Sequence, residues 1–152
     1  MTETLLIHAT AVAIATEQGF RAMLLRGRSG SGKSDLALRL IDAGAHLVTD
    51  DQSVLSRRGD AIIVTPPARI SGLMEVRGIG IMRVEALAEA PVVLIADLVP
   101  AEQIDRQPER RRETILGLSL PVIAVAPFET SAAAKLRLAL RAFTQPGLPV
   151  ML

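Results

Sequence analysis

The apolar positions in the first part of the chain predict a β-hairpin followed by a helix. Residues 5–15 and 20–25 are apolar and tolerant of β structure, and a Gln18-Gly19 turn joins them. The second strand leads into a glycine-rich stretch over 27–34, and a helical pattern follows over 34–43. The apolar residues of that pattern share one helical face: Leu36, Ala37, Leu40 and Ile41. The glycine-rich stretch therefore lies between a strand and a helix.

The rest of the pattern predicts further strands and one last helix. Strands are predicted over residues 46–49, 53–57, 61–65, 91–99 and 121–126. The runs 91–99 and 121–126 are almost continuously apolar, which suits strands buried on both faces. Apolar residues recur at helical spacing after Ser131, and Thr130 or Ser131 can cap that helix.

This succession predicts an α/β fold with a mixed β-sheet flanked by helices. A chain of 152 residues, 49% of them apolar, suits a single domain with its own core. The absence of cysteine excludes disulfides and thiolate chemistry. The N-terminus lacks the pattern of a signal peptide, and no apolar run approaches the ~18 residues of a membrane span. We therefore expect a cytoplasmic protein without a membrane partner.

Charge and aromatic content argue against nucleic acid as a partner. The net charge is +1, so no overall positive field attracts phosphate backbones. Aromatic residues make up only 2% of the chain, which leaves few platforms for stacking single-stranded bases.

The candidate chemistry centres on Gly27-Arg28-Ser29-Gly30-Ser31-Gly32-Lys33-Ser34, which matches the phosphate-binding pattern G-x-x-x-x-G-K-[ST]. Glycines allow successive N–H groups to turn toward an anion, and the helix start adds positive potential. Lys33 would contact the β- and γ-phosphates, and the Ser34 hydroxyl would bind Mg²⁺. The alternative, a glycine-rich turn that binds nothing, does not explain why every fixed position matches. The loop predicts a site for ATP and Mg²⁺.

Two adjacent acids follow the strand over 46–49. Asp51 stands seventeen residues after Ser34, and Asp50 precedes it. In a phosphoryl-transfer site one acid can orient Mg²⁺ and the other can accept a proton from the attacking hydroxyl. An ordinary acidic turn is the alternative interpretation.

Three other features leave a structural and a functional interpretation open. His8 lies within the predicted first strand, where it can be a packing residue or a catalytic one. Glu75 and Arg77 would share one face of a strand, as ligands of a metal and a phosphate or as a surface ion pair. The charged segment 105–113, which contains Arg106, is a solvated loop or a binding element.

The order of these pieces resembles the catalytic domain of the HPr kinase/phosphorylase family. The pieces are the His8 strand, the 27–34 loop, Asp50-Asp51 and the run Glu75-Val76-Arg77-Gly78-Ile79-Gly80-Ile81. The resemblance implies a P-loop-containing domain of the HPr kinase/PEP carboxykinase-like fold. It also implies an enzyme that phosphorylates a serine of the phosphocarrier protein HPr, which regulates the phosphotransferase system, and that can remove the phosphate.

The resemblance further implies roles for individual residues. His8 and Arg106 match active-site residues, and Asp51 matches the proton acceptor in phosphorylation and donor in dephosphorylation. Asp50 lies beside it, and Glu75 matches a second magnesium ligand after Ser34. The resemblance also implies a homo-oligomer, a hexamer. Residues 1–152 are expected to be a single catalytic domain without the family's N-terminal domain.

One departure from the family pattern bears on the reverse reaction. The family has a basic, glycine-containing loop after its last core strand, whereas this chain has Pro127-Phe128-Glu129-Thr130-Ser131. An acid in place of bases predicts weaker anion binding there, so the phosphorylase activity is left open. Two alternatives to a protein kinase also stay open: a nucleotide-sensing regulatory module without phosphoryl transfer, and a small-molecule kinase.

Overall fold

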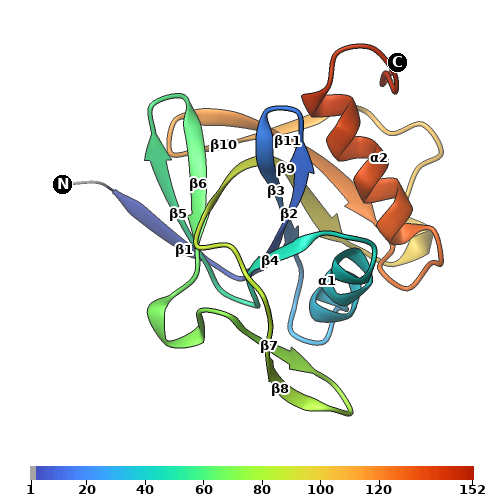
Figure 1. Cartoon of the computed structure of the whole chain (residues 1–152). Coiled ribbons are helices and arrows are strands. Elements are labelled where there is room, and N and C mark those ends of the chain that lie inside the picture. Colours follow the sequence, from blue (N-terminus) through green and yellow to red (C-terminus); the bar gives the residue numbers. More distant parts are fainter. Residues whose placement is uncertain (1–2) are drawn as a thin grey trace.

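The computed structural model describes residues 3–152, which form a strongly curled β-sheet with two α-helices (Figure 1). The helices are α1 (Lys33–Asp42) and α2 (Ala132–Thr144), and two short 3-10 helices are η1 (Ala68–Ile70) and η2 (Ala101–Gln103). The strands are β1 (Thr4–Ile7), β2 (Ala9–Thr16), β3 (Gly19–Arg26), β4 (His46–Thr49), β5 (Ser53–Arg58), β6 (Ala61–Thr65), β7 (Leu73–Val76), β8 (Gly80–Arg83), β9 (Ala90–Leu98), β10 (Arg111–Ile115) and β11 (Leu118–Val125).

The main sheet is mixed, as predicted. Its strands follow the order β1-β5-β6-β9-β3-β2-β4, and β11 joins β9 and carries β10 on its other side. The central strand β9 is parallel to β3 and β11 and antiparallel to β6. β7 and β8 form a separate two-stranded hairpin.

Strand direction brings four chain segments to one edge of the sheet. β3 and β11 both run parallel to β9, so their C-terminal ends meet at the same edge. β4 is antiparallel to β2, which is antiparallel to β3, and so β4 also ends there. Three of the four segments leave these strands: the loop 27–32, the acids after β4 and the loop 127–131. The fourth is the start of β2, which lies at the same edge because Ala9 pairs with Arg26.

Each face of the sheet buries its own apolar cluster. One cluster packs both helices on the sheet, with Leu36 and Leu40 from α1 and Leu136 and Leu140 from α2. The curl of the sheet closes the other face, where β5 and β6 cover the far sides of β2 and β3 (Figure 1). Since strong apolar burial is the main stabilising term in folding, these two clusters fix the strand ends that carry the loops.

The structure differs from the sequence prediction in three places. The first predicted strand is broken at His8, which lies between β1 and β2 instead of within a strand. Arg77 lies in the turn between β7 and β8, so it does not share a strand face with Glu75. The charged segment is a loop only as far as residue 110, because Arg111 begins β10.

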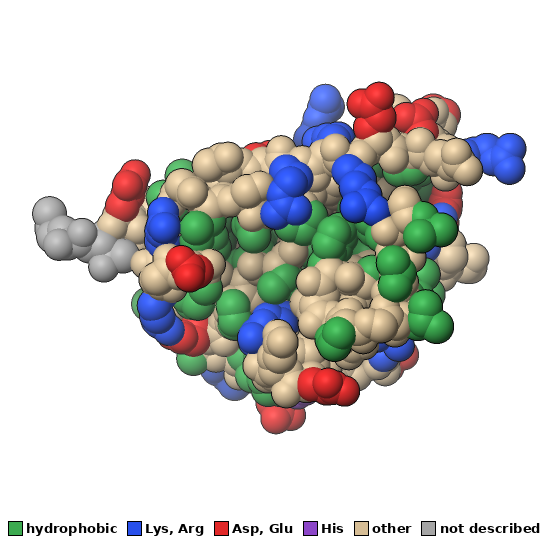
Figure 2. All heavy atoms as spheres, turned by 90° about the horizontal axis from the view of Figure 1, so that it is seen from above, with side chains coloured by type: hydrophobic (Ala, Val, Ile, Leu, Met, Phe, Trp, Pro, Cys, Tyr) green, Lys and Arg blue, Asp and Glu red, His purple; other side chains and the backbone are tan. Residues whose placement is uncertain are grey.

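The surface of the molecule at the end opposite to the loop edge carries charges of both signs. Seen from above (Figure 2), apolar side chains gather in the middle of this surface, and basic and acidic groups lie around them.

No helix within residues 3–152 has the length and apolar character that crossing a membrane requires.

Candidate functional site

The glycine-rich loop between β3 and α1 has the backbone that its sequence predicts. Gly30 and Gly32 have φ values of 80° and 102°, which side chains with a Cβ disfavour. A Cβ on Gly27 would lie 2.4 Å from Ser31 Oγ and 3.0 Å from Ser31 Cβ, so a larger residue there would force Ser31 to move. The N–H of Ser31 donates to the carbonyl of Arg28 at 3.0 Å, which turns the loop toward α1.

Lys33 begins α1 and holds the loop. Its side chain is 4% exposed, and Nζ donates to the carbonyls of Gly27 and Arg28 at 2.9 Å each. Nζ also lies 3.6 Å from Asp51 Oδ1. A nearly buried ammonium whose partners are two carbonyls and one half-exposed acid is well placed to bind a further anion.

Asp50 is the hub of the hydrogen bonds at this edge. The Ser34 hydroxyl donates to its Oδ1 at 2.7 Å, and the Thr10 hydroxyl donates to the same oxygen at 3.2 Å. The backbone N–H of Glu75 donates to Oδ2 at 3.1 Å. Asp50 is 7% exposed, so these donors replace the water that the carboxylate loses on burial. The carboxylate therefore ties α1, β2 and β7 together.

Asp51 adopts a backbone conformation that is rare for a residue with a side chain. Its φ is 64°, and its N–H donates to Thr10 Oγ1 at 3.0 Å. This conformation directs the Asp51 carboxylate to within 3.6 Å of Lys33 Nζ and 4.0 Å of His8 Nδ1. Strain of this kind is common where a side chain must be aimed at a reacting group.

Thr10 is a site residue that the sequence prediction missed. It lies on β2 opposite Leu25, two residues after His8, and it is fully buried. Its hydroxyl donates to Asp50 and accepts from the Asp51 backbone, so it positions both acids. A buried threonine on a strand has no distinguishing pattern in one sequence, and only the pairing of β2 with β4 brings it to the acids.

Several of these residues line a cleft of about 450 Å³, within the range of small-ligand sites, whereas His8 and Thr10 do not line it. The loop contributes Ser29, Gly30 and Gly32, and the acids Asp50, Asp51 and Glu75 line it as well. The other lining residues are Lys33, Ser34, Asp35, Leu38, Val76, Arg77 and Phe128.

The oxygen donors at the cleft have the chemistry of a magnesium site. Ser34 Oγ lies against Asp50 Oδ1, and the exposed Glu75 carboxylate lines the same cleft. Mg²⁺ prefers oxygen ligands, keeps several waters and commonly uses one or two carboxylates with substrate phosphates. Within residues 3–152 no group of three or more His, Asp or Glu residues is close enough to hold a metal ion unaided. Ser34, Asp50 and Glu75 therefore fit a Mg²⁺ ion that binds together with the phosphates of a ligand.

The family model of the HPr serine kinase C-terminal domain matches residues 1–126. The chain belongs to this family. It is 34% identical over 113 residues to the HPr kinase/phosphorylase of Chloroherpeton thalassium, an alignment with 66% of this chain and 33% of the relative. With the HPr kinase/phosphorylase of Leptothrix cholodnii it shares 38% identity over 117 residues, 68% of this chain and 36% of the relative. The chain thus spans about a third of the length of these relatives.

The fold is also that of an HPr kinase. The solved structure of the Hpr(Ser) kinase/phosphatase from Coxiella burnetii matches with a TM-score of 0.77 and 27% identity. The match covers 90% of this chain and 94% of that one. The α/β fold class expected from the resemblance is therefore confirmed.

In this HPr kinase family member Arg106 does not line the cleft. It lies in the exposed segment between η2 and β10, and no hydrogen bond or ion pair in residues 3–152 joins it to the loop or the acids. The role predicted for Arg106 stays a prediction. A different arginine ends β3 directly before the loop: Arg26 donates through its guanidinium to both oxygens of Asp97 and of Glu113, at 2.7 to 3.1 Å. Hydrogen bonds to Glu113 and then Asp97 raise the pKa of Arg26 above its ordinary value.

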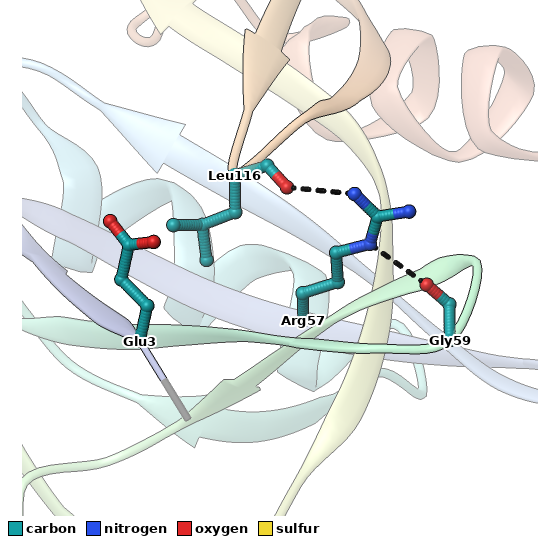
Figure 3. Close-up of a pocket in the computed structure, with 4 residues that line it drawn as sticks. All are labelled: Glu3, Arg57, Gly59 and Leu116. Atoms are coloured by element: carbon teal, nitrogen blue, oxygen red, sulfur yellow. Dashed lines mark hydrogen bonds between the residues drawn. The ribbon is translucent and has the colours of Figure 1, made fainter. Parts of the chain in front are cut away.

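A second, more open pocket of about 520 Å³ lies away from the cleft (Figure 3). It is lined by Glu3, Arg57, Gly59 and Leu116. The Arg57 guanidinium already donates to the carbonyls of Gly59 and Leu116, at 3.0 and 3.2 Å. None of the predicted site residues lines this pocket, so the cleft beside α1 is the candidate active site of the family member.

Proposed function

We propose that the chain is an ATP- and Mg²⁺-dependent protein serine kinase whose acceptor is an HPr-type phosphocarrier protein. The observation that carries the proposal is the shared cleft of the glycine-rich loop and Asp51. In-line transfer of a phosphoryl group to a hydroxyl needs a phosphate-binding loop with its lysine and an acid that can accept the proton, and the cleft combines the loop, Lys33 and the half-exposed Asp51.

In this proposal Asp51 is the general base. Its carboxylate is 54% exposed at the mouth of the site, where an acceptor serine can approach it. Lys33 Nζ, now 3.6 Å from Asp51 Oδ1, would bind the β- and γ-phosphates and offset the charge that develops on transfer. His8, 4.0 Å from the same carboxylate oxygen, would help to orient it.

Ser34, Asp50 and Glu75 would hold Mg²⁺, the first through its hydroxyl and the acids directly or through water. The ion supplies charge neutralisation on the phosphates when it is bound. Asp50 keeps the Ser34 hydroxyl in place, since the two side chains are joined by a 2.7 Å hydrogen bond.

Family membership supports the acceptor and the assembly state. The relatives are named HPr kinase/phosphorylase, and the proposal takes its acceptor, HPr, and its role in regulating the phosphotransferase system from that family. From the same source it takes a catalytic domain over residues 1–152, a homo-oligomeric state and a cytoplasmic location. The reverse reaction is not part of the proposal, because the loop 127–131 presents Glu129 instead of bases. The Glu129 carboxylate is already paired with Lys135 Nζ at 2.8 Å.

Incubation with labelled ATP, Mg²⁺ and HPr tests the proposal. The expected product is HPr that carries phosphoserine. A protein that binds ATP but leaves HPr unlabelled in a single turnover would be a nucleotide-sensing module instead, an alternative favoured by the absence of Arg106 from the cleft. Preferred transfer to a small metabolite in a screen of acceptors would indicate a small-molecule kinase.

A further inference from the structure

One aromatic side chain stands out at the rim of the cleft. The chain has three phenylalanines and neither tyrosine nor tryptophan. Phe20 and Phe143 pack against the two core clusters, whereas Phe128 is 73% exposed and lines the cleft. An exposed phenylalanine buries little apolar surface, so folding alone does not explain it.

The Phe128 ring is placed against the start of α1. A Cβ on Gly32 would lie 3.0 Å from Phe128 Cζ and 3.2 Å from Pro127 Cβ. The ring therefore lies against the glycine that caps the helix, one residue before Lys33. Only a residue without a side chain at position 32 allows this approach.

The backbone on either side of Phe128 is fixed to α1. Arg39 donates to the carbonyl of Pro127 and, at 3.2 Å, to the carbonyl of Glu129. Arg39 is itself paired with Asp35 at 3.0 Å, one turn earlier on α1. Because the carbonyls on both sides of Phe128 are held, the ring is presented from a rigid support.

Phe128 and the acids approach α1 from different sides. Ser34 faces Asp50, and Arg39 faces the loop 127–129. Arg39 follows Ser34 by five positions, which places their side chains about 140° apart around the helix axis. A ligand whose phosphates lie over the helix start thus has acids on one side and an aromatic ring on another.

We infer that Phe128 is the platform on which the base of the bound nucleotide stacks. The inference rests on the proposed function, because it assigns the phosphates to the loop and the transferred group to Asp51. A purine has a flat π-face that stacks on an aromatic ring whatever its substituents. Leu38, 39% exposed one turn into α1, adds apolar surface to the same cleft. Phe128 is a specificity residue, favouring nucleotides over other triphosphates.

The test compares a ligand with a base to one without it. Affinities for ATP and for inorganic tripolyphosphate are measured by calorimetry on the whole chain, in the parent and in Phe128→Ala and Phe128→Leu. Both substitutions should weaken ATP binding by about fivefold to 150-fold, the range for loss of one base stack, and leave tripolyphosphate binding unchanged. Leu138→Ala, which truncates a 51% exposed side chain on α2 outside the cleft, should change neither affinity.

A fluorescence experiment gives a second readout. The chain has no tryptophan, so Phe128→Trp introduces a single reporter. Stacking predicts that ATP alters its emission and that tripolyphosphate does not.

Each other outcome overturns the inference in a recognisable way. If Phe128→Ala binds ATP like the parent, the platform is wrong while the proposed function stands. If that variant loses both ligands equally, the ring shapes the loop and does not read the base. If it keeps ATP affinity but loses affinity for HPr, the ring belongs to the acceptor's docking surface. A parent that binds neither ligand would overturn the proposed function as well.

Discussion

The Thr10 hydroxyl donates a 3.2 Å hydrogen bond to Asp50 Oδ1, although the two residues are forty positions apart in the chain. The same hydroxyl accepts the N–H of Asp51 at 3.0 Å. One buried side chain on β2 thus fixes the carboxylate that orients Ser34 and the backbone that aims Asp51. Two sequence-distant parts of the site are held in register by a residue that lies outside every motif.

Thr10→Val should separate this positioning role from simple packing. Valine keeps the shape but removes both hydrogen bonds, which leaves a buried carboxylate oxygen with one donor fewer. We expect a loss of about 1–3 kcal/mol in the free energy of unfolding, measured with urea. Phosphoryl transfer should fall through kcat more than through KM for ATP. Thr10→Ser, which keeps the hydroxyl, should restore most of both; equal loss in Ser and Val variants would contradict the role.

Gly32→Ala should be more harmful than Gly30→Ala. Both glycines have positive φ, so each substitution carries a backbone cost of about 1–2 kcal/mol. A Cβ at position 30 meets nothing within 4 Å, whereas one at position 32 would press on Phe128 and Pro127. The difference between the two unfolding free energies measures that contact. It should shrink in a Phe128→Ala background, and an unchanged difference would mean that the ring is not the obstacle.

Arg26 should contribute more to the free energy of unfolding than Arg58, an exposed arginine that is also paired with a carboxylate. Arg26 is 25% exposed and binds two acids from β9 and β10, and Arg58 is 64% exposed and binds Glu89. Arg26→Ala leaves Asp97 and Glu113 without their main donor, for an expected loss of about 2–3 kcal/mol in unfolding free energy. Arg58→Ala should cost much less, because water replaces the exposed pair. Similar losses in urea titrations of the two variants would contradict the prediction.

Ser34→Ala should reduce the dependence of ATP binding on Mg²⁺. The Ser34 hydroxyl is the one that Asp50 holds at 2.7 Å, and Ser34→Thr keeps a hydroxyl at that position. With Mg²⁺ present, Ser34→Ala should bind ATP about tenfold to a hundredfold more weakly than the parent. With EDTA in place of Mg²⁺, the two proteins should bind ATP alike, as measured by calorimetry. An equal deficit in both conditions would assign Ser34 a role in folding or phosphate binding only.

The sequence predicted correctly those elements that depend on residues close together in the chain. The loop 27–34, α1 and the strand before Asp50 follow from glycine spacing and apolar periodicity, which are set within a few residues. The break at His8 was not predicted, because residues 5–15 are uniformly β-tolerant and the interruption arises from pairing β1 with β5 and β2 with β3. Arg77 was misplaced because β7 ends at Val76, where the Ile79 N–H donates to the Val76 carbonyl and closes a turn that contains Arg77.

Long-range contacts explain what the sequence could not supply. Thr10 reaches the two acids only through the pairing of β2 with β4, and Phe128 reaches the cleft only through the placement of β11 beside β9. Arg26 shows the same limit, because its partners Asp97 and Glu113 reach it only through the pairing of β3 with β9 and of β11 with β10. The role that the resemblance implies for Arg106 stays a prediction.

Asp51→Asn tests the assignment of the general base. Asparagine tolerates positive φ at least as well as aspartate, so the backbone at φ 64° should keep its conformation. Nucleotide affinity should stay within a few-fold of the parent, because Lys33 keeps its bonds to the carbonyls of Gly27 and Arg28. Transfer of labelled phosphate to HPr should fall by about 10² to 10⁴, the usual contribution of a positioned base.

The matched control is His8→Asn, since His8 lies 4.0 Å from the same carboxylate and is 72% exposed. If His8 only helps to orient Asp51, its loss should reduce transfer far less than Asp51→Asn does. A His8 variant as inactive as the Asp51 variant, with nucleotide binding intact in both, would move the proton-accepting role to the histidine. Parent-like transfer by Asp51→Asn would remove the aspartate from the chemical step, because an amide cannot take up the serine proton at neutral pH.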